Sequence, residues 1–166
     1  MRLEYGPARL RIDLDSGASV ELVQGGTCWT VDGDGWTGPR GAALIWPLDS
    51  GGGWELRAPD DPDPDSSFGG RVARVSGEAE GEATVVTDDG RLFRVVPVVD
   101  PSGEGVWELR GWETSGAYWT ARRAGRDWEV QRTVAGSMLA EDPALAVLFA
   151  AAIGAADGQD GSRTIP

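Results

Sequence analysis

The amino-acid sequence predicts an all-β protein with one helix near its C-terminal end, and three observations lead to this class. Short segments in which apolar and polar residues alternate recur through most of the chain. Clusters of Gly, Asp, Ser and Pro separate these segments, as is typical of turns between strands. Near the end, one segment of helical length is apolar on every face.

The alternating segments predict about twelve strands within residues 1–136. The clearest runs from Ala8 to Leu14, where apolar residues alternate with Arg9, Arg11 and Asp13, so one face of this strand is expected to be buried. Gly90 ends an Asp-Asp-Gly sequence that fits a tight hairpin turn. The expected strands are residues 2–5, 8–14, 19–23, 29–31, 42–48, 54–57, 71–76, 82–87, 91–99, 106–111, 116–122 and 127–134.

The helix is expected at residues 143–156. Asp142 is suited to accept the free amides of the first turn, and Pro143 suits the first helical position because no N–H is needed there. Gly158 can end the helix in the left-handed conformation. Residues 158–166 are then expected to form a flexible tail.

No polar side chain occurs from Ala144 to Ala156, so this helix has no face suited to water. It is too short to cross a bilayer. The simplest container is a closed antiparallel β-barrel of about twelve strands around the helix, and this is the predicted fold class, in a single domain. The alternative is an exposed helix that docks into a partner.

Residues 58–70 interrupt the strand pattern with three prolines among acidic residues, and we expect a mobile acidic loop between two halves of the sheet. Asp61, Asp63 and Asp65 have the spacing of the first carboxylates in a calcium loop. Ser66 stands where such a loop needs Gly, and Val72 where it needs Glu. A solvated loop without metal is the favoured interpretation.

Missing residue types exclude many kinds of catalysis. The chain has no His, no Lys and one cysteine, Cys28. It therefore has no Ser-His-Asp triad, no imidazole-bound zinc, no Schiff-base lysine and no iron–sulfur cluster. We expect no cofactor and no enzymatic activity, with a small hydrolase based on two carboxylates as the remaining enzyme alternative.

The formal net charge of −12 bears on partners and location. It argues against nucleic acid and would favour a basic protein partner. No apolar run reaches the roughly 18 residues of a membrane span, and the first residues lack the apolar core of a secretion signal. A cytoplasmic protein is expected.

The exposed candidates for binding are two tryptophans and three arginines. Trp36 and Trp112 lie beside Gly-rich turns, whereas Trp29, Trp54, Trp107 and Trp128 lie in alternating strands and are expected in the core. Arginines around one predicted hairpin turn could form a small anion site, with a solvated turn as the alternative. These are Arg122, Arg123 and Arg126. Cys28 is expected to be a small buried hydrophobe.

The C-terminal part of the chain resembles the LURP-one-related proteins of the tubby-like group, which also includes tubby C-terminal domains and phospholipid scramblases. The resemblance lies in Trp107-Glu-Leu-Arg-Gly111, Tyr118-Trp-Thr-Ala-Arg122, Trp128-Glu-Val130 and Asp142 to Asp157. It implies a barrel filled by a C-terminal helix, and lipid or phosphoinositide binding. The chain departs from the group because it has no Lys and no cysteine cluster, so no functional residue is carried over.

These observations predict a non-enzymatic binding or scaffolding module whose partner meets the acidic surface or one end of the barrel. The alternatives are a barrel that binds lipid or phosphoinositide, an acidic inhibitor or immunity protein for a basic partner, and the carboxylate-dependent hydrolase. Fold alone does not decide among them.

Overall fold

The structure is a computed structural model that describes residues 1–25, 28–38, 40–45, 53–57, 70–74, 83–87, 90–99, 105–112, 116–133 and 142–156. Twelve strands and one helix lie in this part of the chain. They are β1 (Arg2–Gly6), β2 (Arg9–Asp13), β3 (Ser19–Gly25), β4 (Cys28–Asp32), β5 (Ala43–Ile45), β6 (Gly53–Arg57), β7 (Gly70–Arg74), β8 (Ala83–Val86), β9 (Leu92–Val99), β10 (Gly105–Gly111), β11 (Ala117–Ala124), β12 (Asp127–Arg132) and α1 (Pro143–Ala156).

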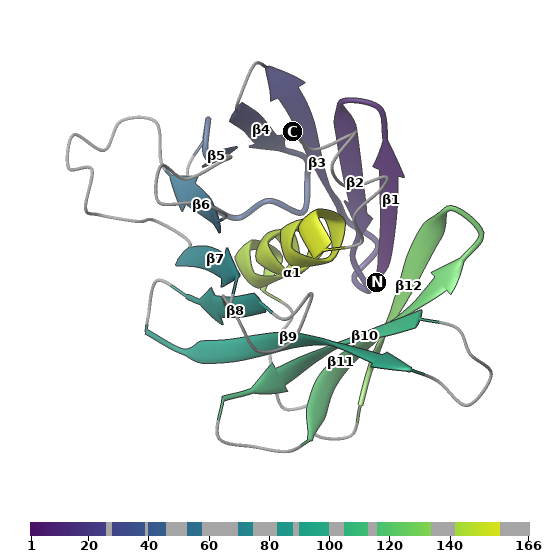
Figure 1. Ribbon diagram of the computed structural model, residues 1–166. Coiled ribbons are helices and arrows are strands. Elements are labelled where there is room, and N and C mark those ends of the chain that lie inside the picture. Colours follow the sequence, from purple (N-terminus) through teal and green to yellow (C-terminus); the bar gives the residue numbers. More distant parts are fainter. Residues whose placement is uncertain are drawn as a thin grey trace.

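All twelve strands belong to one antiparallel sheet in which each strand pairs with its neighbours in sequence. The order of hydrogen-bonded strands is β1-β12-β11-β10-β9-β8-β7-β6-β5-β4-β3-β2, with β1 beside both β2 and β12. The sheet curls, and α1 lies inside the curl (Figure 1). Successive hairpins explain this topology, since antiparallel strands need only short turns between them.

The predicted fold class, a closed barrel around a central helix, needs correction at its seam, because the first and last strands pair over a very short ladder. β1 meets β12 over two residue pairs, Arg2 with Glu129 and Leu3 with Trp128. The ladder of β1 with β2 has five pairs and that of β11 with β12 has six. A hollow of about 630 Å³ lies beside the short ladder. Alternation in the sequence specifies strands and their buried faces, but it does not specify how far the first and last strands overlap.

The alternation of side chains accounts for the buried face of the sheet. In β2, Leu10 and Ile12 are buried while Arg9 and Arg11 are exposed. The observed strand begins at Arg9, one residue after the predicted start at Ala8. Ala8 has a φ of 56° and belongs to the preceding turn. Period-two patterning therefore positions the core well and locates strand ends less well.

Helix α1 spans Pro143–Ala156, the range that the sequence predicts. The backbone N–H of Ala144 donates to the carboxylate of Asp142 at 3.0 Å, which is the expected N-cap. All side chains from Leu145 to Ile153 are at most 1 % exposed, so the alternative of an exposed docking helix is wrong for this stretch.

The helix backbone lies nearest to β6, β7, β8 and β9. Larger side chains fill the wider space on the other side of the curl. There the rings of Trp119 and Phe149 meet edge to face, with centroids 5.6 Å apart. The hydroxyl of Tyr5 in β1 donates to the carbonyl oxygen of Ala150. This side of the curl also holds the buried Trp107 and Trp128.

Several sequence-based expectations fall outside the described residues. Residues 58–69 of the predicted acidic loop, with Asp61, Asp63 and Asp65, are among them, as is the predicted tail at 158–166. Gly70, the last residue of the predicted loop, begins β7. In the described part of the chain, no helix has the length and apolar character needed to cross a membrane.

Candidate functional site

The β11–β12 hairpin carries the three arginines that the sequence singles out. Because side chains alternate along β11, Arg123 shares the inward face with Trp119 and Ala121, whereas Arg122 points to the outer face. Arg126 lies in the turn between Ala124 and Asp127. All three side chains are exposed, but Arg122 and Arg123 lie on opposite faces of the sheet.

Arg123 borders a cleft at the end of the sheet formed by the β11–β12 hairpin. We call it the tryptophan cleft. Its volume is about 560 Å³. The residues that line it come from the end of β9, the start of β10 and the β11–β12 hairpin, and they are Pro97, Gly105, Val106, Trp107, Arg123, Gly125 and Trp128.

The register of the strands explains why a hollow forms there. Trp107 lies opposite Pro97 in β9, and Arg123 lies opposite Trp128 in β12. Gly105 stands at the start of β10 and contributes no side chain between them. A Cβ at Gly105 would meet no atom within 4 Å. Two glycines of the lining, Gly105 and Gly125, therefore leave space beside the larger side chains of the cleft.

The chemistry of the cleft combines indole rings with one cation. The guanidinium carbon of Arg123 lies 4.9 Å from the ring centroid of Trp128, a cation–π contact. Trp107 is 7 % exposed and Trp128 is 3 % exposed, so packing holds both rings in place. Within the described part of the lining, Arg123 is the one charged side chain.

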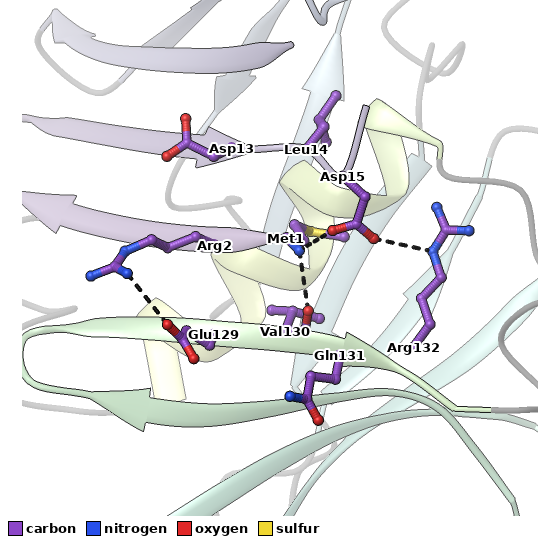
Figure 2. A pocket seen from close by; sticks show the side chains of 9 residues that line it. All are labelled: Met1, Arg2, Asp13, Leu14, Asp15, Glu129, Val130, Gln131 and Arg132. Atoms are coloured by element: carbon purple, nitrogen blue, oxygen red, sulfur yellow. Dashed lines mark hydrogen bonds and ion pairs between the residues drawn. The ribbon is translucent and has the colours of Figure 1, made fainter. Parts of the chain in front are cut away.

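A second hollow, the seam pocket, lies beside the short β1–β12 ladder and has a volume of about 630 Å³ (Figure 2). It is lined by Met1, Arg2, Asp13, Leu14, Asp15, Glu129, Val130, Gln131 and Arg132. The terminal amino group of Met1 pairs with Asp15 and donates to the carbonyl oxygen of Val130 at 3.2 Å. Arg132 lies 3.6 Å from the second oxygen of Asp15.

Arg2 joins the two strands of the seam. It donates to Asp127 at 2.9 Å and to Glu129 at 3.4 Å, both on β12. The hydrogen bond to Asp127 is the largest cause of the raised pKa of Arg2. Most charged groups at the seam therefore form ion pairs with one another.

The seam pocket bears on the hydrolase alternative because three carboxylates line it. Asp13 pairs with Arg11 at 2.9 Å, Asp15 with Met1 and Arg132, and Glu129 with Arg2. Glycoside hydrolysis by two carboxyl groups needs one of them as a proton donor. All three carboxylates of the pocket are therefore already held in ion pairs, so the arrangement fits an ion-pair seam better than a catalytic pair.

The other sequence candidates lie elsewhere. Trp112 is 48 % exposed and follows β10 at the end opposite Gly105. Its backbone N–H donates to the carbonyl oxygen of Leu92 at 3.3 Å, and the side chain of Leu92 is also exposed. Trp36 is half-buried and packs against the core. Cys28 is half-buried, whereas the sequence predicts burial. In the parts of the chain that the structure describes, no cluster of three or more potential metal ligands occurs.

Sequence reasoning placed Trp107 and Trp128 in the core, and both are buried. It missed that each also lines a cleft. The available signal was the glycine two residues before Trp107, but its meaning depends on which residues of β9, β11 and β12 lie beside it. That register is not visible in the sequence pattern.

Comparison with protein-family models, with curated proteins and with solved structures finds no match. The resemblance to the tubby-like group therefore stays a prediction, and the site has to be interpreted from its own geometry.

Proposed function

We propose that this protein is a non-enzymatic binding module whose ligand site is the tryptophan cleft. The observation that carries the proposal is a cleft of about 560 Å³ with indole and aliphatic walls and one guanidinium. Ligand pockets usually measure roughly 300–1,000 Å³ and combine apolar walls with a few polar groups.

The residues of the cleft are suited to binding and poorly suited to catalysis. Of the described lining residues, Arg123 alone has an ionisable side chain, and a guanidinium stays protonated, so it cannot act as a general base. Among the lining residues that the structure describes, none has a hydroxyl, thiol or carboxyl side chain.

The walls of the cleft are fixed before a ligand arrives. Trp107 and Trp128 lie within paired strands, opposite Pro97 and Arg123. Sites built on such strands lose little conformational entropy on binding, which supports affinity.

Protein-detected NMR with a library of small aromatic fragments tests the proposal. Binders are expected to shift the indole N–H signals of Trp107 and Trp128. Gly105→Val would add a side chain to the lining of the hollow, and its Cβ would meet no atom within 4 Å. This variant is expected to lose the shifts.

Gly116→Val is the matched control, because Gly116 also has open space around it and lies outside the cleft. It is expected to bind fragments as the unmodified protein does. Shifts that survive Gly105→Val, or a library with no binder at the two indoles, would contradict the proposal.

A further inference from the structure

We infer that the β1–β12 seam, the join between the first and last strands, is a gate at which the sheet opens locally, and that Arg2 is its latch. This inference goes beyond the proposed function and does not depend on the tryptophan cleft. It follows from the topology of the sheet, the hollows beside the join and the charges that cross it.

The topology makes this join unlike the other ladders of the described strands. In each of the others, the two strands are consecutive in the chain. β1 and β12 come from opposite ends of the sheet sequence, and their ladder has two residue pairs. The next shortest ladders, β4–β5 and β5–β6, have three pairs. The seam can therefore open without separating the strands of any hairpin.

Hollows lie on both sides of this short ladder. The seam pocket, of about 630 Å³, lies toward Met1 and Arg132 (Figure 2). A second hollow, of about 440 Å³, lies toward the other end of β1, and its lining includes Gly6 and Asp127. Atoms beside a hollow lack packing partners on that side. The ladder therefore receives less support from packing at both of its ends.

The charges that cross the seam meet at Arg2. Its guanidinium donates to Asp127 at 2.9 Å and to Glu129 at 3.4 Å, both on β12. It also lies 3.6 Å from Glu4 of its own strand. Without Arg2, the seam would bring Glu4 of β1 close to two carboxylates of β12, and like charges repel. Arg2 therefore replaces repulsion across the seam with attraction.

Other contacts hold the two strands when the seam opens. β1 pairs with β2 over five residue pairs, and the hydroxyl of Tyr5 donates to the carbonyl oxygen of Ala150 in α1. β12 pairs with β11 over six residue pairs, and the helix backbone lies nearest to β6–β9. Opening therefore exposes Leu3 and Trp128, which are at most 3 % exposed, while both neighbouring ladders stay formed.

Hydrogen exchange followed by NMR tests the gate. The backbone N–H of Val130 donates to the carbonyl oxygen of Met1 at 2.8 Å. Bonded pairs alternate along an antiparallel ladder, so Leu3 and Trp128 also direct their N–H groups across the seam. Relative to an unstructured chain, these two amides are expected to exchange at least about tenfold faster than the amides of β9 and β10.

Arg2→Met removes the latch. It is expected to speed the exchange of the Leu3 and Trp128 amides at least about threefold, the effect of a few surface ion pairs of ordinary strength. Arg9→Met is the matched control, because Arg9 forms its 2.7 Å ion pair with Glu21 away from the seam. It is expected to leave the two amides unchanged, and the amides of β9 and β10 show whether each variant is folded.

Salt is expected to act with opposite signs in the two forms of the seam. Raising NaCl from roughly 0.05 M to about 0.5 M shortens the Debye length to a few ångströms. In the unmodified protein, this weakens the attraction to Arg2 and should speed exchange of the seam amides. In Arg2→Met, it weakens the repulsion among the carboxylates and should slow their exchange.

A reversible cross-link closes the gate directly. Arg2 and Glu129 are opposite each other between bonded pairs, where side chains of an antiparallel ladder come closest. Arg2→Cys with Glu129→Cys, in a Cys28→Ser chain, is expected to form a disulfide across the seam. Exchange of the Leu3 and Trp128 amides should then fall to the level of β9 and β10, and reduction should restore fast exchange.

Four results would each overturn the inference. Seam amides that exchange no faster than those of β9 and β10 would show that the sheet has no local opening there. Fast exchange that persists in the cross-linked chain would place the opening elsewhere. Equal effects of Arg2→Met and Arg9→Met, or salt that speeds exchange in Arg2→Met as well, would show that Arg2 is not the latch.

Discussion

At the scale of single residues, the backbone of the β4–β5 turn depends on Gly33. Its φ is +114°, and a Cβ there would overlap the carbonyl oxygen of Ser19. That oxygen also accepts the backbone N–H of Gly35 at 2.8 Å. Gly33→Ala is therefore expected to lower the free energy of unfolding through both backbone strain and overlap, as measured by urea denaturation.

Gly17→Ala separates the two causes. Gly17 has a φ of +92°, but a Cβ there would meet no atom within 4 Å. Its cost is expected to be the conformational part alone, about 1–2 kcal/mol. Equal costs for the two variants would show that the turn moves away from Ser19 without penalty.

Asp34, in the same turn, connects stability to pH. Its carboxylate accepts the backbone N–H of Ser19 at 2.8 Å, and this hydrogen bond is the largest cause of its lowered pKa. A carboxyl group whose pKa is lower in the folded state stabilises the fold above its ordinary pKa, and this contribution is lost as pH falls through the folded value.

Thermal melts between pH 6 and pH 2 test this linkage. The difference in melting temperature between the unmodified protein and Asp34→Ala is expected to shrink as pH falls below about 4, the ordinary carboxyl range. Asp34→Asn keeps an acceptor oxygen without a titrating charge. The difference in melting temperature between Asp34→Asn and Asp34→Ala should therefore not change with the titration of a carboxyl group. If the difference between the unmodified protein and Asp34→Ala were also constant with pH, the prediction would be contradicted.

At the scale of elements, the first turn of α1 depends on Asp142. Asp142→Ala removes the acceptor for the backbone N–H of Ala144, and we expect a loss of roughly 0.5–2 kcal/mol in a urea melt. Asp142→Asn keeps the acceptor but loses the charge that lies 3.7 Å from Arg91. It should retain most of the stability, because exposed ion pairs contribute little. Equal losses in both variants would assign the effect to the ion pair.

The body of α1 depends on Phe149, which is fully buried against Trp119. Phe149→Ala is expected to cost roughly 3–5 kcal/mol in the free energy of unfolding, because it leaves a cavity inside the curl of the sheet. Val23→Ala is the control, since Val23 is 50 % exposed and such changes cost little. A loss below 1 kcal/mol for Phe149→Ala would contradict this enclosure.

The helix and most strands could be predicted from sequence because their signals are local. Asp142 and Pro143 mark the start of α1, and Leu10 and Ile12 mark the buried face of β2. Strand ends were less certain, since turn residues such as Ala8 decide them through backbone angles. The cleft could not be predicted, because Gly105 and Arg123 become neighbours only through strand pairing.

At the scale of the whole molecule, sheet and helix share one hydrophobic cluster. It includes Leu3 of β1, Leu44 of β5, Leu109 of β10 and Phe149 of α1. The same observation explains why the short join between β1 and β12 is not predicted from the sequence. An enclosed helix requires surrounding walls, but it does not require that β1 and β12 pair along their length.

One shared core predicts one cooperative unit. Under native conditions, Phe149→Ala should lower the protection of backbone amides against hydrogen exchange in β3 and β10 alike, because both unfold with the helix. Loss of protection confined to β6–β9, which lie nearest to α1, would instead show separate units.

The place of α1 after all twelve strands has a consequence for synthesis on the ribosome. Chains grow at about 5–20 residues per second, so the strands emerge seconds before the helix that fills their curl. Until then, the inner faces of these strands have no partner and can bind chaperones or other nascent chains. The inner faces of the strands are therefore buried, and the tendency to aggregate falls, only after the apolar helix has been synthesised.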